Sequence, residues 1–198
     1  MFLEHPPDSE EVESDFAADR EEDGYVTNGT RLWAWRPGLF GAFRALRTEL
    51  MESSALTDRD WAILVTATAS QLHDSYCALA WGPRLAELSD AETAAQVLAG
   101  LPASALSERE AALAEWARKV ARDPNATTSE DVARLREVGL GDREIFEATA
   151  FIAFRLALAT VNDSLGAAPD KQLLDAAPEP IRRVVTYGRS PSTEPSPA

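Results

Sequence analysis

One short stretch of the sequence brings together side chains that can do chemistry. It contains His73, Asp74 and Cys77, and Cys77 is the only cysteine in the chain. An apolar, helix-compatible run over 61–72 precedes it, and a second run follows. Asp74 suits the N-cap of that second helix, because a carboxylate there accepts a backbone N–H of the first turn. Cys77 would then lie inside the first turn, where the positive end of the helix dipole favours a thiolate.

The chemistry of Cys77 has two interpretations. As a nucleophile it would use the helix start, with His73 as a general base four residues earlier. As an inert core residue it would behave as a small hydrophobe, and Asp74 favours this interpretation, because a neighbouring carboxylate raises the pKa of a thiol. His73 equally suits a helix end, bonded to a carbonyl or to Asp74. With no second cysteine, an oxidised Cys77 would need an external thiol as reductant.

Aromatic and charged side chains around this stretch suggest a binding site. Tyr76, Trp81 and Trp61 could line a pocket for an apolar or aromatic ligand, or could simply fill space in the core. Asp74 needs a partner if it is buried, and Arg155 in a distant apolar segment is the candidate. An Asp74–Arg155 pair would be structural, or would hold the carboxylate of a ligand.

Composition excludes several classes of protein. Of the net charge of −14, the first 24 residues contribute −9, and the remainder has no cluster of Lys and Arg that would bind nucleic acid or an anionic membrane. One cysteine excludes an intrachain disulfide and a cysteine-rich zinc site, and we expect no metal and no cofactor. No secretory signal or membrane-spanning run is evident. We expect a cytoplasmic protein.

The chain is predicted to hold one domain. Residues 1–27 are acidic and poor in large apolar groups, so we expect a disordered tail that aids solubility or docks a basic partner. Residues 28–188 form the domain, and 189–198, rich in Ser, Pro and Thr, form a second disordered tail. Within the domain, helical periodicity and capping boxes predict an all-α fold. The helices are expected at 38–52, 57–72, 75–88, 90–99, 107–122, 129–138, 142–165 and, interrupted by prolines, near 170–186.

The segment 142–165 is apolar on nearly every face. Such a helix belongs in the centre of a bundle or at a subunit interface. The sequence therefore predicts that the chain forms a homo-oligomer.

Several motifs resemble one family. The stretch at 70–82, the Arg36-Pro37-Gly38-Leu39 segment and the Leu135-Arg136…Gly139 segment are similar to those of alkylhydroperoxidase-D-like (carboxymuconolactone decarboxylase-like) proteins, in particular their peroxidase-related branch. The resemblance covers about residues 31–168 and implies an all-α bundle. The family carries a Glu, a Cys-x-x-Cys pair and a His four residues later. Cys77 matches the attacking cysteine, whereas Asp74, Trp81 and Ala62 stand at the resolving-cysteine, relay-histidine and relay-glutamate positions.

The resemblance implies two classes of function. The first is a one-cysteine thiol peroxidase, an antioxidant oxidoreductase that reduces hydroperoxides through Cys77 with help from His73 and an external thiol. The second is a non-redox, carboxymuconolactone decarboxylase-like protein, either a small-molecule binder or a cofactor-free enzyme, with Asp74 and Trp81 in its site. Family members assemble as dimers, trimers or hexamers, which is the kind of assembly expected here.

Overall fold

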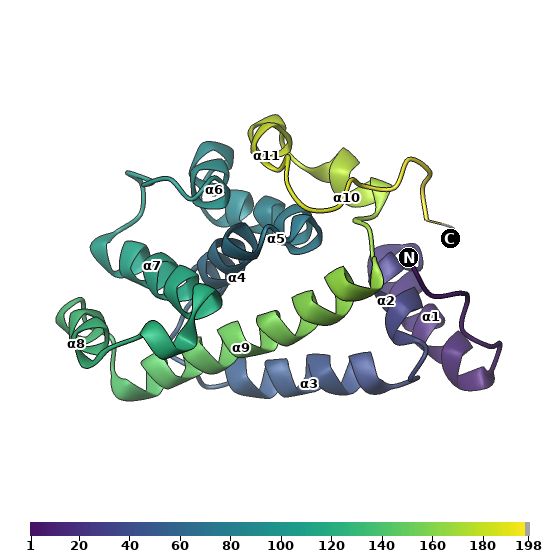
Figure 1. Cartoon of the computed structure of the whole chain (residues 1–198), viewed down its shortest axis with the longest axis horizontal. Coiled ribbons are helices and arrows are strands. Elements are labelled where there is room, and N and C mark those ends of the chain that lie inside the picture. The colour runs from purple at the N-terminus through teal and green to yellow at the C-terminus, as the bar shows by residue number, and fades with distance from the viewer. Residues whose placement is uncertain (197–198) are drawn as a thin grey trace.

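The fold is a bundle of α-helices, seen in a computed structural model that describes residues 1–196 (Figure 1). Within these residues there are eleven α-helices, one 3₁₀ turn and no strand, which confirms the predicted all-α class. In chain order they are α1 (Glu10–Asp23), α2 (Asn28–Trp33), α3 (Leu39–Met51), α4 (Asp58–Leu72), α5 (Ser75–Leu88), α6 (Ala91–Leu98), α7 (Glu108–Arg122), η1 (Pro124–Ala126), α8 (Ser129–Glu137), α9 (Asp142–Leu165), α10 (Lys171–Ala176) and α11 (Glu179–Val184).

Helix α4 is the centre of the bundle. Ten consecutive residues of it, from Asp60 to Ala69, are buried, and it packs against α5, α6, α7 and α9. Trp61 lies in this core with its ring 4.8 Å from that of Phe151 on α9. The sequence predicted that 142–165 lies in the centre of a bundle or at a subunit interface. Within the chain, α9 is buried along one face and leaves Phe146 exposed.

Local capping explains where most of the helices begin. Thr57 with Asp60, and Ser107 with Glu110, form reciprocal capping boxes at the starts of α4 and α7. Asp74 caps α5, as predicted, by accepting the Cys77 N–H at 3.0 Å. The expected helix near 170–186 is two short helices, because the chain leaves the helical conformation at Ala177 and Pro178.

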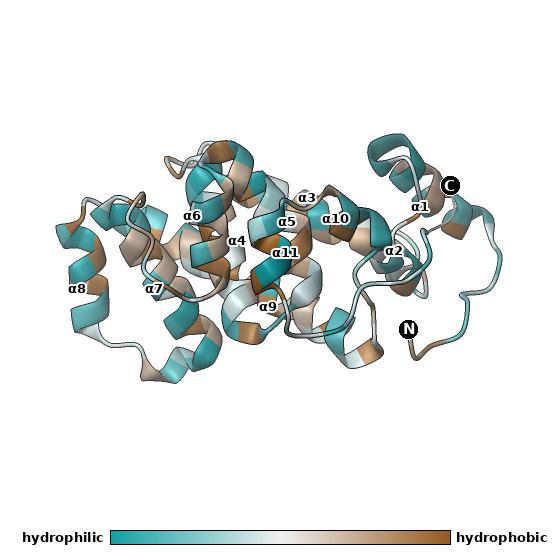
Figure 2. Ribbon diagram, turned by 90° about the horizontal axis from the view of Figure 1, so that it is seen from above, coloured by the Kyte–Doolittle hydropathy of each residue, from teal (hydrophilic) through white to brown (hydrophobic). Residues whose placement is uncertain are grey.

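The acidic N-terminal region differs from the disordered tail expected over 1–27. Residues Glu10–Asp23 form α1, which begins at a Ser9 cap and ends at Gly24 in the left-handed conformation. Figure 2 shows that α1 is largely hydrophilic. Helix α1 therefore makes few apolar contacts with the domain and is held mainly by polar ones. Asp19 accepts the Thr27 N–H at 2.8 Å, and Glu22 pairs with Arg44.

The C-terminal segment also has defined contacts where a disordered tail was expected. The Ser192 N–H donates to the Pro169 carbonyl at 2.8 Å, and the Ser196 hydroxyl donates to Asp170 at 2.6 Å. Residues 197–198 of that predicted tail lie outside the described residues. The N-terminus lies near the C-terminal end of α9 (Figure 1), where the Phe2 N–H donates to the Leu165 carbonyl at 2.9 Å.

Over residues 1–196, every helix is too short or too polar to cross a lipid bilayer.

Candidate functional site

A cavity of about 350 Å³ opens beside Cys77. Its walls come from α1, α3, α5, α9 and α10, so it lies between the N-terminal region and the main bundle. This volume is at the lower end for small-molecule sites. Charged, aromatic and apolar side chains line it, among them Asp19, Glu22, Asp23, Phe40, Phe43, Arg44, Arg47, Tyr76, Cys77, Trp81, Arg155 and Leu158.

Cys77 lies at the wall of this cavity with only 5% of its surface exposed. The guanidinium of Arg155 donates a hydrogen bond from Nη2 to Sγ over 2.9 Å. Burial raises the pKa of the Cys77 thiol, and Asp74 raises it too, whereas Arg155 lowers it. The effect of burial is the largest, so the thiol is protonated at neutral pH, and Arg155 is the group that would stabilise a thiolate once formed.

Arg155 does not make the pair with Asp74 that the sequence suggested. Its nitrogen atoms make no ion pair with an Asp74 oxygen within 4.0 Å, and its Nε is buried without a hydrogen-bond partner. The second oxygen of Asp74, Oδ2, is also buried without a partner. The two charges therefore act on Cys77 separately, one from the start of α5 and one from α9.

A second arginine faces the same aromatic wall. The guanidinium carbons of Arg155 and Arg47 lie 5.6 and 6.0 Å from the ring of Trp81, within the range of cation–π attraction. Arg47 forms no ion pair or hydrogen bond with a described residue, and its Nε is buried. Burial, and then repulsion by Arg155, lowers the pKa of Arg47.

The part of the cavity lined by α1 is acidic. Asp19, Glu22 and Asp23 of α1 line the cavity, and burial together with Asp19 and Glu22 raises the pKa of Asp23. Arg44 of α3 is matched by Glu22, whose charge also acts on Arg47. The cavity therefore combines carboxylates from α1 with two guanidinium groups that form no ion pair with a described residue.

The residues selected from the sequence separate into two groups. Cys77, Tyr76, Trp81 and Arg155 line the cavity. Tyr76 is held in place, because its hydroxyl donates to Asp170 at 2.7 Å and accepts the Gly29 N–H at 3.1 Å. Asp74 lies one turn behind the cavity, as the cap of α5.

His73 and Trp61 are not brought to the cavity. His73 is exposed, ends α4 in the left-handed conformation with φ 56°, and packs on Tyr187 with ring centroids 5.4 Å apart. Trp61 belongs to the core. The sequence reasoning missed Arg47, since an arginine on the polar side of an amphipathic helix has no feature that separates it from a solvated one.

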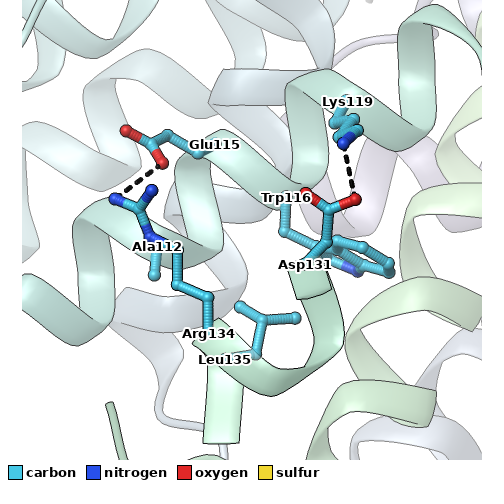
Figure 3. Close-up of a pocket in the computed structure, with 7 residues that line it drawn as sticks. All are labelled: Ala112, Glu115, Trp116, Lys119, Asp131, Arg134 and Leu135. Carbon is cyan, nitrogen blue, oxygen red and sulfur yellow. Dashed lines mark hydrogen bonds and ion pairs between the residues drawn. The ribbon is translucent and has the colours of Figure 1, made fainter. Parts of the chain in front are cut away.

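Another hollow, of about 90 Å³, lies between α7 and α8 (Figure 3). Its charged residues are matched: Lys119 pairs with Asp131, and Arg134 lies 3.3 Å from Glu115. It is small and leaves no charge unpaired, so the cavity at Cys77 is the better candidate. Among residues 1–196, no group of three His, Cys, Asp or Glu side chains is placed to hold a metal ion.

Solved structures share this arrangement of helices. A peroxidase-related protein from Ralstonia eutropha JMP134, described as an alkylhydroperoxidase AhpD core, matches with a TM-score of 0.77 and 24% identity over 87% of this chain and 93% of that chain. A peroxidase-related protein from Silicibacter sp. TM1040 matches with a TM-score of 0.76 and 22% identity over the same shares. Both are called uncharacterized.

A third structure bears a different name. It is a cysteine-to-alanine variant of the debrominase Bmp8 in complex with 2,3,4-tribromopyrrole, with a TM-score of 0.70 and 16% identity over 88% of this chain and 95% of that chain. No protein-family model and no curated protein matches the sequence. At these identities the likeness concerns the architecture, and it confirms the expected one: this chain has the alkylhydroperoxidase AhpD-like fold.

Proposed function

We propose that this chain is a one-cysteine, thiol-dependent oxidoreductase that reduces a small hydroperoxide at Cys77. The observation that carries the proposal is the Arg155 N–H directed at Sγ over 2.9 Å on the wall of a cavity. A buried guanidinium is costly without an anion, and a thiolate formed during reaction would supply one. The peroxidase-related names of two proteins with this fold support the same chemistry.

The proposed reaction needs one external reductant, a small thiol. The Cys77 thiol loses its proton, and the resulting thiolate attacks the terminal oxygen of the hydroperoxide. The O–O bond breaks, the alkoxide takes up the proton that the thiol released and leaves as an alcohol, and Sγ becomes a sulfenic acid. A first thiol displaces water and forms a mixed disulfide with Cys77. A second thiol attacks that disulfide, which restores the Cys77 thiol and releases the oxidised reductant.

The test is the trapping of the sulfenic acid. Reduced protein is treated with cumene hydroperoxide in the presence of dimedone, and the mass of the Cys77 peptide is followed. We expect the adduct in the wild type and its loss in Cys77→Ser. Arg155→Met should slow the reaction about tenfold or more, because a hydrogen bond to a charged group is worth about 1.5–3 kcal/mol. His73→Gln is the matched control and should react at the wild-type rate, since His73 lies outside the cavity.

A non-redox protein on the same scaffold is the second candidate. The raised pKa of Cys77 and the lack of a second cysteine favour it. In this case the cavity binds a small molecule, and Cys77→Ser binds it as well as the wild type does. The brominated pyrrole in the Bmp8 structure makes halogenated rings one class to screen. Failure to form any dimedone adduct across pH 6–10 would leave this candidate in place of the peroxidase.

We also propose that the chain self-associates through the outer face of α3 and α9. Leu46 and Phe146 on that face are 47% and 69% exposed, and both border a hollow that Leu50 and Phe154 also line. An exposed side chain beside a hollow suits a two-fold interface, because Phe146 of each copy can then fill the hollow of the other copy. Light scattering should give the mass of an oligomer for the wild type and of a monomer for Phe146→Glu. A monomeric wild type at 50 µM would contradict the proposal.

A further inference from the structure

The two arginines at Trp81 form no ion pair with any residue that the structure describes. Arg155 is 6% exposed, and the hydrogen bond of its side chain within residues 1–196 goes to the Cys77 sulfur. The side chain of Arg47 has none with any described residue. Burial, and then repulsion by Arg155, lowers the pKa of Arg47, whereas Glu22 raises it. Bringing two like charges together in a partly desolvated place is unfavourable unless an anion occupies the space between or beside them.

The geometry of the guanidinium groups indicates what kind of anion. A guanidinium presents pairs of parallel N–H groups, and these match the two oxygens of a carboxylate. Arg155 uses Nη2 for the sulfur and keeps its Nε–H unpartnered. A carboxylate held there would lie beside Sγ, since the same planar group contacts both.

The remaining walls define the rest of the ligand. Phe40, Phe43 and Leu158 are apolar, and the ring of Trp81 stands beneath both arginines. A flat or hydrocarbon body would pack on these surfaces. Asp19, Glu22 and Asp23 also line the cavity and would repel a second negative charge. The site thus suits one carboxylate at one end and no further anion.

We infer that the substrate or ligand of the Cys77 cavity is a small organic monocarboxylate with an apolar or aromatic body, held by Arg47 and Arg155. The inference deepens the proposed function and rests on it for the statement that this ligand is presented to Cys77. The binding itself does not depend on redox chemistry. It can therefore be tested in protein that lacks the thiol.

The experiment uses the full chain carrying Cys77→Ser and isothermal titration calorimetry. The probes are naphthalene-2-carboxylate, its neutral carboxamide and naphthalene-2,6-dicarboxylate. We expect the monocarboxylate to bind at least about tenfold more tightly than the carboxamide and than the dicarboxylate, since charge-assisted hydrogen bonds are roughly twice as strong as neutral ones. Arg47→Gln should reduce the preference for carboxylate over carboxamide to near unity. Arg84→Gln is the matched control, because Arg84 lies on α5 but pairs only with surface acids, Asp58 and Glu87.

The outcomes separate the two proposals. Equal affinity for carboxylate and carboxamide, or a preference that survives Arg47→Gln, overturns the inference, and the dimedone reaction of Cys77 would be untouched by that result. Selective carboxylate binding together with a Cys77 that never reacts with hydroperoxide supports the inference and removes the peroxidase. Circular dichroism shows whether Arg47→Gln folds. If it does not, the three probes on the Cys77→Ser protein still test the inference, because this protein must itself prefer the monocarboxylate to the carboxamide and to the dicarboxylate.

Discussion

Two clusters of arginines in this protein are built in opposite ways. At the starts of α4, α7 and α9, Arg109 contacts both oxygens of Asp60 at 2.8 and 2.9 Å and Glu144 at 3.3 Å. Beside it, Arg59 contacts Glu110 at 2.6 Å. In the cavity, neither Arg47 nor Arg155 forms an ion pair with a carboxylate of residues 1–196. The arginines of the first cluster are paired with carboxylates of the protein and connect three helices. Those of the second cluster form no such pairs.

The contrast explains why burial of charge alone does not identify a site. A half-buried arginine such as Arg109, whose side-chain hydrogen bonds end on the capping carboxylates Asp60 and Glu144, contributes to the fold. Arg155 differs, because its side chain donates to a thiol and its Nε has no partner. Such an arrangement lowers the stability of the fold, and residues that do so are often functional. Substitutions in the two clusters should therefore have opposite effects on stability.

The largest effect is expected from Arg109→Gln. Asp60 is nearly fully buried, so losing its partner leaves an uncompensated charge, and we expect the free energy of unfolding to fall by about 3 kcal/mol. Urea unfolding followed by circular dichroism measures it. Arg134→Gln is the matched control, because that arginine pairs with Glu115 in solvent, and its loss should cost less than about 1 kcal/mol. Equal effects of the two substitutions would contradict the assignment of Arg109 to the fold.

Arg155→Met should behave in the opposite way. Replacing a buried arginine that has no carboxylate by an apolar side chain of similar length should leave stability unchanged or raise it by about 1 kcal/mol, while it slows the reaction at Cys77. The same urea titration and the dimedone assay measure the two effects. A loss of stability as large as that of Arg109→Gln would show that Arg155 is a structural residue, and the comparison of the clusters would fail.

A smaller effect is expected in the pH dependence of Cys77 alkylation, which reports the pKa of the thiol. Because burial raises the pKa of the thiol, the rate with iodoacetamide should rise only above the free-thiol value of about 8.5. Arg155→Met should move the rise to still higher pH, since Arg155 lowers that pKa. The folded state binds the thiol proton more tightly than the unfolded state does. The stability from this group is thus complete below about pH 8.5 and is lost as the pH rises further. A midpoint below 8.5 would mean an activated thiolate instead.

The smallest effect concerns Asp163 on α9. Partial burial, followed by repulsion from Asp74, raises the pKa of Asp163 to about 6. The folded state therefore holds this proton more tightly than the unfolded state, and stability should decline as the pH rises from about 4 to about 6. Asp163 is partly exposed, so solvent screening should keep the change below about 1 kcal/mol. Comparing the pH profile of unfolding with that of Asp163→Asn, which should lack this decline, measures it.

Most of the helical bundle was predictable because its signals are local. Capping residues, apolar spacing and Gly139 at the end of α8 lie within a few positions of the feature they define. Helix α1 was not predictable in the same way. Its composition indicates disorder, and what orders it is a set of polar contacts to residues in α2, α3 and their connections, such as Asp19 with Thr27. Such contacts depend on how the chain folds back and leave no periodic pattern.

The candidate site was predictable in part for the same reason. Cys77, Tyr76 and Trp81 share one helix, so the sequence placed them together, and the apolar surroundings of Arg155 marked it as unusual. The role given to His73 rested on its spacing from Cys77, and the left-handed turn at His73 directs the chain so that its ring meets Tyr187 instead. Arg47 comes from a helix that the sequence did not connect to α5.

The polar attachment of α1 has a consequence for how molecules reach Cys77. One wall of the cavity is a helix held by an ion pair and a few hydrogen bonds to carboxylates, with Val12 and Asp19 as its only buried residues. Salt screens the ion pair between Glu22 and Arg44 and leaves the apolar contacts of the bundle intact. We therefore expect small molecules to enter and leave the cavity faster at high ionic strength, while the helices that carry Cys77 and Arg155 stay in place.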